Sequence, residues 1–543
     1  IIFIADYFKE QVPGGGELAN DELIKRLEEK EYKITTKQSH EVTIDFVDKH
    51  ADKFFIIANF TQLPRDVIKR LQTTRYVIYE HDHKYIRTRD PSQYDNYIVP
   101  EYLFVNKDFY KNAKSVLCQS SIHAETVSKN LLLNNIVNLG CSLWPKKILD
   151  YIEKLSKNTK EDKVSIVNSS NKIKGTLEAT QYCRAKKIDY ELISSADYKD
   201  FLKQLSKNET LMFFSHVLES FCRLAVEARM LGCKVITNKN TAATQEPWFK
   251  LKGKELIDVI RAKQEEVIQT FIDIINEKKV DYVATYEIPK ISLITSVYDG
   301  DEFIEGFLED ITKQTVFDKC ELILINPNSP GSEEKIINQY LDKYDNIIYK
   351  KLDTDPGVYG VWNLGVQMST GEYISNANID DRRAPQQLEG LAKFLMFGGD
   401  TDLVYAECFV TSQPNETYIK NSSKNKVYTT LEYSPENMVK CLPGPMPLWK
   451  KAIHEQAGFF DEDYKYAGDW DMWLRAIRSG AKFKKVEGVY GLYYYNPKGL
   501  STDPTKRKER FLEEKKIFLE YRNIFGEENF NKFLGSEDIN RQL

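Results

Sequence analysis

The chain has 543 residues, with 76 Lys and Arg against 81 Asp and Glu, a net charge of −5 and 42% hydrophobic residues. This length predicts several domains, and the hydrophobic fraction excludes a disordered chain. The slightly acidic balance argues against a general nucleic-acid binder, which needs a basic surface.

The first half of the sequence predicts two blocks of alternating strands and helices, residues 1–150 and 151–284. Short apolar runs mark the predicted strands, at residues 1–5, 54–58, 76–79, 116–118, 164–167, 190–193 and 211–214. Helical patterns lie between several of these runs, for example at residues 18–32 and 176–184. This alternation predicts parallel sheets with helices on both faces, so we expect two Rossmann-like lobes.

Two glutamates, Glu219 and Glu227, stand eight residues apart in the second block. Apolar residues from 221 to 231 recur at helical spacing, which predicts an amphipathic helix packed on the sheet. Eight residues cover about 12 Å of helix at roughly 1.5 Å per residue, enough to reach from a sugar to a ribose. The start of such a helix also favours a phosphate through its free N–H groups and its dipole.

Two more features accompany the glutamate pair: residues 14–17 read Gly-Gly-Gly-Glu, and Lys174 precedes Gly175. Together with the glutamates, they resemble the GT-B glycosyltransferases of family 4. That family places an arginine shortly before the Lys-Gly step, whereas this chain has Ser169 there.

The resemblance implies a retaining GT-B head. In it, Glu219 faces the donor sugar as a catalytic residue, and Glu227 grips the ribose. Gly15, Gly16 and Lys174 would bind the donor phosphates, because residues without Cβ let backbone amides approach closely.

His81 and His83 flank Asp82 after a predicted strand. On a strand, a His-x-His pair points both rings to one face and could bind a metal. The family 4 resemblance instead suggests a histidine beside the acceptor. A loop histidine with protein hydrogen-bond partners is the third interpretation, and the sequence leaves all three open.

The polar segment 278–289 predicts a linker to a third block, residues 285–503. Apolar runs at residues 291–298 and 322–326 predict the first strands of another parallel sheet. The charged residues 504–543 predict a helical tail, with a solvated basic face around Arg510. The expected fold is therefore α/β, with two Rossmann-like lobes followed by a nucleotide-sugar-binding α/β domain.

Residues 376–383 read Asn-Ala-Asn-Ile-Asp-Asp-Arg-Arg and directly follow a strand-like run. Carboxylates at a strand end can hold a divalent cation against a diphosphate. Mg²⁺ and Mn²⁺ prefer oxygen ligands and take only one or two carboxylates from the protein. We therefore predict Asp380 and Asp381 as metal ligands. An Asp-Asp pair alone is also typical of a solvated turn.

Five segments of this block occur in the order found in family 2 glycosyltransferases of GT-A fold, which they resemble: residues 291–298, 322–326, 378–381, 458–471 and 499–501. The resemblance implies a bound Mn²⁺ or Mg²⁺ and a nucleotide-sugar donor, with a UDP-sugar as the default. It also implies donor contacts from a further set of residues: Thr295, Val297, Tyr298, Asn326 and Asn378. Asn326 and Asn378 replace aspartates of the family pattern.

Asp469 opens a helix-like run and is the predicted catalytic base, which takes the proton of the acceptor hydroxyl. The resemblance implies attack opposite the leaving diphosphate, and therefore inversion at the sugar. The alternative is that Asp469 is a plain helix N-cap, although Asp471 could be the cap instead and leave Asp469 free.

These patterns predict a bifunctional glycosyltransferase of polysaccharide biosynthesis, with a retaining GT-B head and an inverting, metal-dependent GT-A head. Its expected partners are nucleotide-sugar donors and a glycan or lipid-linked glycan acceptor, and nucleic acid is not expected. Two alternatives stay open. One is a single active GT-A head with an inert GT-B scaffold, and the other is a non-catalytic glycan-binding or assembly protein.

Eight cysteines are spread singly and form no Cys-x-x-Cys pair, so neither a zinc site nor a disulfide framework is indicated. Buried free thiols fit a reducing compartment. We find no run of eighteen apolar residues and no secretory signal. We therefore expect a cytoplasmic protein without a transmembrane segment, and peripheral membrane contact stays open.

Overall fold

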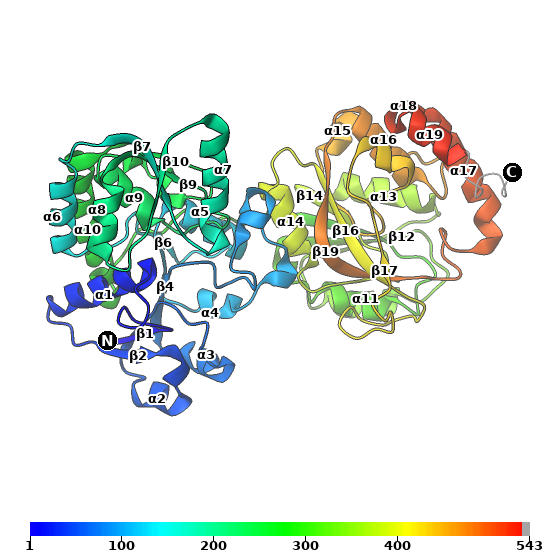
Figure 1. Cartoon of the computed structure of the whole chain (residues 1–543). Coiled ribbons are helices and arrows are strands. Elements are labelled where there is room, and N and C mark those ends of the chain that lie inside the picture. The colour runs from blue at the N-terminus through cyan, green and yellow to red at the C-terminus, as the bar shows by residue number, and fades with distance from the viewer. Residues whose placement is uncertain (535–543) are drawn as a thin grey trace. The chain divides into compact units, whose positions relative to one another are not determined.

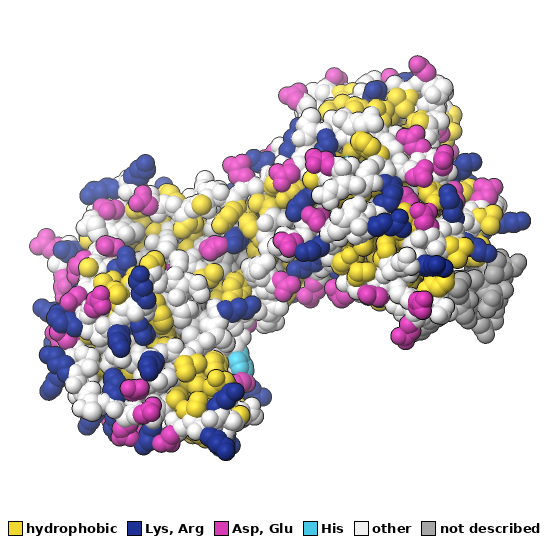
Figure 2. All heavy atoms as spheres, turned by 90° about the horizontal axis from the view of Figure 1, so that it is seen from above, with side chains coloured by type: hydrophobic (Ala, Val, Ile, Leu, Met, Phe, Trp, Pro, Cys, Tyr) yellow, Lys and Arg dark blue, Asp and Glu magenta, His cyan; other side chains and the backbone are white. Residues whose placement is uncertain are grey.

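The computed structural model describes residues 1–534, which form two compact units (Figure 1). The N-terminal unit comprises Ile1–Val99 and Leu103–Tyr286, and the C-terminal unit comprises Pro100–Tyr102 and the chain from Glu287 onward. Acidic and basic side chains are interspersed over the visible face of each unit (Figure 2). This mixture fits the small net charge of the sequence.

The first lobe of the N-terminal unit is built on a six-stranded sheet in the order β2-β1-β3-β4-β5-β6, with every pair parallel. Its strands are β1 Ile2–Ala5, β2 Thr35–Gln38, β3 Phe54–Ile57, β4 Arg75–Glu80, β5 Val116–Cys118 and β6 Ile136–Asn138. The connecting helices are α1 Gly15–Glu28, α2 Ile44–Lys49, α3 Arg65–Leu71, α4 Lys107–Lys111 and α5 Ser121–Leu131. Strands β1 and β3 are buried along their whole length, as expected for a sheet covered on both faces.

The second lobe has a four-stranded parallel sheet in the order β10-β9-β7-β8. Its strands are β7 Glu161–Val167, β8 Tyr190–Ile193, β9 Asn208–Phe213 and β10 Lys234–Thr237. Its helices are α6 Lys146–Leu155, α7 Thr176–Lys186, α8 Tyr198–Leu205, α9 Arg223–Met230 and α10 Gly253–Ile275. Helix α10 packs against α1 of the first lobe and against α6 and α9 of the second. The predicted parallel, Rossmann-like α/β class is confirmed.

The C-terminal unit is built on one mixed sheet in the order β13-β12-β11-β14-β18-β16-β19-β15, with β17 paired to β16. Its strands are β11 Ile291–Ser296, β12 Cys320–Asn326, β13 Ile347–Lys351, β14 Tyr373–Asn376, β15 Arg382–Arg383, β16 Leu403–Thr411, β17 Val427–Tyr428, β18 Leu448–Lys450 and β19 Phe483–Tyr494. Strands β11 to β14 are parallel to one another, so their carboxyl ends meet at one edge.

Nine helices complete the described part of this unit: α11 Ile304–Ile311, α12 Glu334–Leu341, α13 Gly357–Met368, α14 Gln387–Phe397, α15 Ile453–Ala457, α16 Gly468–Arg478, α17 Arg507–Glu520, α18 Arg522–Phe525 and α19 Glu527–Leu534. Helices α17 and α18 and the residue between them supply Ile517, Phe518, Tyr521 and Phe525 to the buried cluster that contains Trp473. Much of the segment expected as a tail is therefore part of the core of this unit. Residues 535–543 lie outside the described residues.

The segment between the two units contains no helix or strand from residue 278 to residue 290, in agreement with a linker. All eight cysteines are free thiols, and seven of them are buried. Within residues 1–534, no helix is both long enough and apolar enough to cross a bilayer.

Candidate active site

A cavity of about 2000 Å³ lies in the C-terminal unit, where β11 and β14 end. Five of the predicted site residues line it: Tyr298, Asn378, Asp380, Asp381 and Asp469. They come from segments far apart in the sequence, namely the end of β11, the turn after β14 and the first turn of α16. The topology therefore brings the predicted metal ligands and the predicted base into one space.

Three predicted donor contacts do not line the cavity. Thr295 and Val297 are buried in the sheet, and side chains alternate along a strand, so Ser296 and Tyr298 face the cavity instead. Asn326 is 2% exposed. Its amide donates to the Tyr349 hydroxyl at 3.1 Å, and its Oδ1 accepts from the backbone N–H of Ser329 at 2.7 Å, so it shapes the turn after β12.

Asp380 and Asp381 follow β14 and accept hydrogen bonds from the surrounding turns. Asn496 donates to Asp380 Oδ2 at 3.0 Å. Asp381 Oδ2 accepts from the Asn378 amide at 3.1 Å, and its Oδ1 accepts from the backbone N–H of Tyr494 at 3.1 Å. The Asn496 amide thus bonds only one oxygen of Asp380. No side chain among residues 1–534 donates to the other oxygen, Oδ1, and Asp380 lines the cavity.

The electrostatics of this pair suit a divalent cation. Burial raises the pKa of Asp380, and burial together with the neighbouring Asp380 charge raises the pKa of Asp381 to about 8. The half-buried Asp380 and the buried Asp381 are adjacent carboxylates that repel each other, and a bound cation relieves that repulsion. No group of three or more His, Cys, Asp or Glu side chains forms a metal site within residues 1–534. An all-oxygen pair fits Mg²⁺ or Mn²⁺, which complete their shell with phosphates and water.

Asp469 stands in the first turn of α16 and lines the cavity. The Tyr359 hydroxyl donates to its Oδ1 at 3.3 Å, and the Cys441 thiol lies 3.6 Å from its Oδ2. Burial raises the pKa of Asp469, so its ionised form is a stronger base than an exposed aspartate. The carboxylate is thus held by two donors inside the cavity, as a general base requires.

The helix N-cap alternative is wrong for both aspartates. Ala467 occupies the N-cap position of α16, and no side chain caps it from there. Asp471 is buried and accepts from Arg475 Nε at 2.8 Å and from the Tyr521 hydroxyl at 2.7 Å. Asp471 therefore joins α16 to Tyr521, between α17 and α18, rather than taking part in the cavity.

Helix α17 adds cavity residues that the sequence did not predict as a site. Arg510 and Glu514 both line the cavity, with Arg510 Nε 3.8 Å from Glu514 Oε1. Arg510 also donates to the Ser501 carbonyl at 2.6 Å. In the sequence these residues belong to a charged helical pattern without any motif, so only the packing of α17 shows that they face the cavity.

In the N-terminal unit, Lys174 and Glu219 are brought together. Lys174 Nζ lies 3.0 Å from Glu219 Oε1. Gly175 has a φ of +64°, and a Cβ there would come within 2.0 Å of the Phe214 carbonyl oxygen, so only glycine fits after Lys174. The Lys-Gly step and the first glutamate of the pair therefore form a direct ion pair, which the sequence analysis did not predict.

The predicted helix that carries both glutamates is wrong in its first half. Helix α9 begins at Arg223, because Cys222 before it has a left-handed φ of +72°. Glu219 thus lies in the segment before the helix. Glu227 is on α9, where its Oε1 accepts from the Trp144 indole at 2.9 Å and from the Tyr198 hydroxyl at 2.6 Å.

Gly15 and Gly16 form the first turn of α1, which no side chain caps. A Cβ on Gly15 would lie 3.2 Å from Arg223 Cδ, and one on Gly16 would lie 3.3 Å from His81 Cγ. Arg223 packs on the Trp144 ring at 4.4 Å, and its Nη2 is buried without a hydrogen-bond partner among residues 1–534. The glycine turn therefore meets a cation that sequence reasoning missed, since Arg223 looked like an ordinary helix residue.

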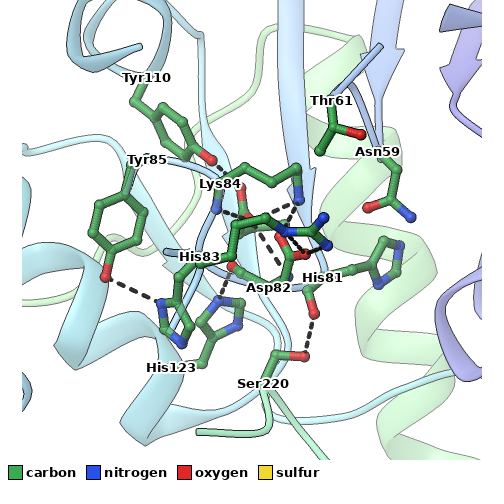
Figure 3. A network of polar contacts seen from close by, with 12 residues as sticks. Asn59, Thr61, His81, Asp82, His83, Lys84, Tyr85, Tyr110, His123 and Ser220 are labelled. Atoms are coloured by element: carbon green, nitrogen blue, oxygen red, sulfur yellow. Dashed lines mark hydrogen bonds and ion pairs between the residues drawn. The ribbon is translucent and has the colours of Figure 1, made fainter. Parts of the chain in front are cut away.

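The two histidines point to different sides of the turn after β4 (Figure 3). His81 lies on the side of Asn59, and its Nε2 contacts Asn20 Oδ1 at 2.7 Å. His83 Nδ1 contacts the Tyr85 hydroxyl at 3.1 Å. Because the rings diverge and each has a protein partner, the interpretation as a metal-binding His-x-His pair is wrong. Burial lowers the pKa of His81 to about 3, so this ring is neutral.

A buried ionic network holds this turn (Figure 3). Lys84 Nζ lies 2.6 Å from Glu80 Oε1 and 2.9 Å from Asp82 Oδ1, and both Lys84 and Glu80 are almost fully buried. The Tyr110 hydroxyl also donates to Glu80. The network fixes the backbone around His81, which places its ring against the glycine turn of α1.

The C-terminal unit thus combines an α/β fold with a carboxylate-lined cavity at its strand ends. Residues 292–456 match the family model described as Glycosyl transferase family 2. The C-terminal unit therefore contains a family 2 glycosyltransferase domain.

Named relatives agree with this class. Over 210 residues, the chain is 27% identical to the "Uncharacterized glycosyltransferase MJ1057" of Methanocaldococcus jannaschii, covering 37% of this chain and 68% of that protein. Over 206 residues, it is 24% identical to the UDP-Gal:alpha-D-GlcNAc-diphosphoundecaprenol beta-1,3-galactosyltransferase of Escherichia coli, covering 37% and 72%. Across five similar relatives, the chain spans 55% to 82% of their length.

Among solved structures, the chain is similar to S. aureus TarS 1-349 in complex with UDP-GlcNAc. That comparison has a TM-score of 0.37 and 16% sequence identity, and it covers 44% of this chain and 71% of that chain.

Proposed function

We propose that the C-terminal unit transfers a sugar from a UDP-sugar to a hydroxyl of a glycan or lipid-linked glycan, with inversion. The observation that carries this proposal is the cavity itself. Asp380, Asp381 and Asp469 line one space, so a donor diphosphate and an acceptor hydroxyl can be bound side by side. A family 2 match over residues 292–456 supports the same reaction class.

On the donor side, Asp380 and Asp381 would hold Mn²⁺ or Mg²⁺, which when bound supplies positive charge against the leaving diphosphate. Asn496 and Asn378 orient these carboxylates through the hydrogen bonds described above. Tyr298 is 48% exposed at the cavity and presents an aromatic face to the nucleotide. These contacts support a leaving group bound at the ends of β11 and β14.

On the acceptor side, Asp469 accepts the proton of the attacking hydroxyl. Its carboxylate is already held by Tyr359 and Cys441, so Asp469 loses little side-chain freedom when an oxygen accepts the proton of the acceptor hydroxyl. Attack from the side opposite the diphosphate inverts the anomeric centre. Glu514 and Arg510 line the same cavity and offer polar contacts to acceptor hydroxyls.

A UDP-sugar is the preferred donor because the name of the E. coli relative specifies UDP-Gal. The acceptor named there is a lipid-linked diphosphate sugar, which supports a lipid-linked glycan here. Exposed Leu512 and Leu519 on α17, 57% and 48% exposed, support peripheral membrane contact. Free thiols throughout the chain support a cytoplasmic location. The glycan acceptor in the name of the E. coli relative supports a role in polysaccharide biosynthesis.

A panel of nucleotide sugars tests this function. We expect at least one UDP-sugar to raise the unfolding temperature in the presence of Mn²⁺ and to release UDP slowly when water replaces the acceptor. Binding at a hundredfold excess over Kd stabilises the folded state by about 2.7 kcal/mol, which a thermal scan detects. If no nucleotide sugar in the panel shifts the transition or is hydrolysed, the proposed function is wrong.

We further propose that the N-terminal unit is a second, retaining GT-B head, which makes the chain bifunctional. The specific observation in its favour is Arg223, whose buried Nη2 has no hydrogen-bond partner among residues 1–534 beside the uncapped first turn of α1. Arg223 offers the cation that Ser169 lacks, and Lys174 supplies a second one. Glu219 and Glu227 would then contact sugar and ribose.

The stoichiometry of nucleotide binding tests the second head. We expect the wild-type chain to bind two nucleotides, and the Arg223→Met variant to bind one, because Met keeps the apolar stem on Trp144 but removes the charge. Isothermal titration with UDP and Mn²⁺ measures this number. Lys234→Met, at an exposed lysine of the same lobe, should leave it unchanged. A single site in the wild type would favour the inert scaffold.

A further inference from the structure

The first turn of α16, which carries Asp469, receives no cap from the side chain at its own N-cap position. Ala467 stands there and has no side-chain acceptor. The N–H groups at the start of a helix have no partner within the helix, so a half-buried start needs acceptors from elsewhere. In this unit, α17 supplies an acceptor for the segment that directly precedes α16, residues 465–467.

The carboxylate of Glu513 on α17 accepts three backbone hydrogen bonds from the segment that enters α16. Its Oε1 accepts from the N–H of Lys465 at 2.8 Å. Its Oε2 accepts from the N–H groups of Tyr466 and Ala467 at 2.8 Å and 3.2 Å. Both oxygens are used in charge-assisted bonds, so the position and the orientation of this segment are fixed. The negative charge also complements the positive end of the α16 dipole.

The contact between the two helical segments is reinforced from the core. The Tyr521 hydroxyl, just after α17, donates to Asp471 of α16 at 2.7 Å. The rings of Trp470 and Phe525 stack with centroids 6.3 Å apart. Tyr521 and Phe525 are fully buried or nearly so, so they hold α17 in one register against α16.

This register matters for the reaction because Asp469 follows Ala467 by two residues. A general base must lie within hydrogen-bond reach of its proton, and a misplacement of about 1 Å can lower a rate by roughly a hundredfold. Glu513 itself does not line the cavity, unlike the neighbouring Glu514. Its contacts are therefore with the backbone that carries the base and not with the space for substrate.

We propose that Glu513 is a positioning residue for Asp469: its carboxylate caps the entry to α16 and holds the catalytic base at the acceptor side of the cavity. The inference rests on the proposed function of the C-terminal unit. It makes α17, which lies beyond the matched family segment, a required part of the active site.

The Glu513→Gln variant of the full chain tests the proposal. Gln has nearly the same shape but replaces one accepting oxygen by an NH₂ group, which faces a backbone N–H without bonding it. With UDP-galactose and UDP-N-acetylglucosamine as donors, Mn²⁺ present and water as acceptor, we expect kcat for UDP release to fall about tenfold or more. Donor KM and the Kd from titration should stay within about twofold of wild type.

Glu520→Gln is the matched control, because Glu520 is exposed on the same helix and accepts no hydrogen bond from the α16 entry. Its kcat should equal that of the wild type. A Glu513→Gln variant with wild-type kcat would overturn the proposal. So would a parallel loss of kcat and donor affinity, because that pattern indicates general damage to the fold and not a misplaced base.

Amide hydrogen exchange gives a readout that does not depend on turnover. In Glu513→Gln, the amides of Lys465, Tyr466 and Ala467 should exchange faster, while the β11 and β14 amides keep their protection. Unchanged exchange at these three amides would also overturn the proposal. Failure of the proposed function appears differently, as wild-type protein that neither binds nor hydrolyses any donor.

Discussion

We expect that replacing Asp469 by Asn abolishes sugar transfer by the C-terminal unit while donor binding survives. The amide has nearly the same shape and can keep the contacts with Tyr359 and Cys441, but it cannot accept the acceptor proton. Loss of a general base typically lowers a rate by roughly 10²–10⁴-fold. Initial rates of UDP release measure kcat, and titration with the UDP-sugar measures donor affinity.

The pH profile gives this prediction a second readout. The base acts in its ionised form, and burial raises the pKa of Asp469. Activity should therefore fall as the pH decreases through that raised pKa, at a higher pH than for an exposed aspartate. Asp463→Asn, at an exposed carboxylate of the preceding turn, should keep both the rate and the profile. Transfer by Asp469→Asn at the wild-type rate would remove the base assignment.

We expect chelation of divalent cations to stop transfer by the C-terminal unit, and added Mn²⁺ to restore it. The physical reason is the pair of adjacent carboxylates, the half-buried Asp380 and the buried Asp381, whose mutual repulsion a cation relieves. Asp380→Ala should lower kcat by roughly a hundredfold or more even in excess Mn²⁺, because the diphosphate charge is then left uncompensated. Rates before and after EDTA treatment, with Mn²⁺ added back, measure the effect.

Thermal scans separate the cation site from general stability. Mn²⁺ should raise the unfolding temperature of the wild type and of Asp469→Asn, because Asp469 belongs to the acceptor side. It should have no such effect on Asp380→Ala. Asp318→Ala, at an exposed carboxylate of the same unit, serves as the control and should respond like the wild type. An equal Mn²⁺ shift in Asp380→Ala would show that the cation binds elsewhere.

Local patterns in the sequence predicted the cavity residues at strand ends and helix starts. Asp380 and Asp381 come soon after a short apolar strand, and neighbouring parallel strands end at one edge of a sheet. Recognising that strand in the sequence is therefore enough to predict that both carboxylates lie at this edge. At β11 the same reasoning selected Thr295, whereas its neighbour Ser296 lines the cavity. That strand is buried on both faces and carries no polar alternation, so the sequence does not show whether Thr295 or Ser296 faces the cavity.

Backbone geometry explains why the helix predicted to carry both Glu219 and Glu227 differs from the observed helix α9. The apolar spacing around Glu219 and Glu227 is typical of a helix, but Cys222 adopts a left-handed conformation and α9 starts only at Arg223. A non-glycine residue in that conformation is costly and persists only where its surroundings stabilise it. The hydrogen bond from Ser220 to the His81 carbonyl belongs to those surroundings and joins two distant segments.

The sequence by itself determined the α/β class, the alternation of strands and helices in both halves, and the identity of the carboxylates that define the C-terminal site. These follow from apolar periodicity and from motifs of a few residues, which are local properties. Only the tertiary structure decided which side chains of β11 face the cavity, that Arg223 meets the glycine turn of α1, and that Glu513 caps the entry to α16. Each of these depends on contacts between segments far apart in the chain, and such contacts are set by the packing of the core and leave no periodic signal in the sequence.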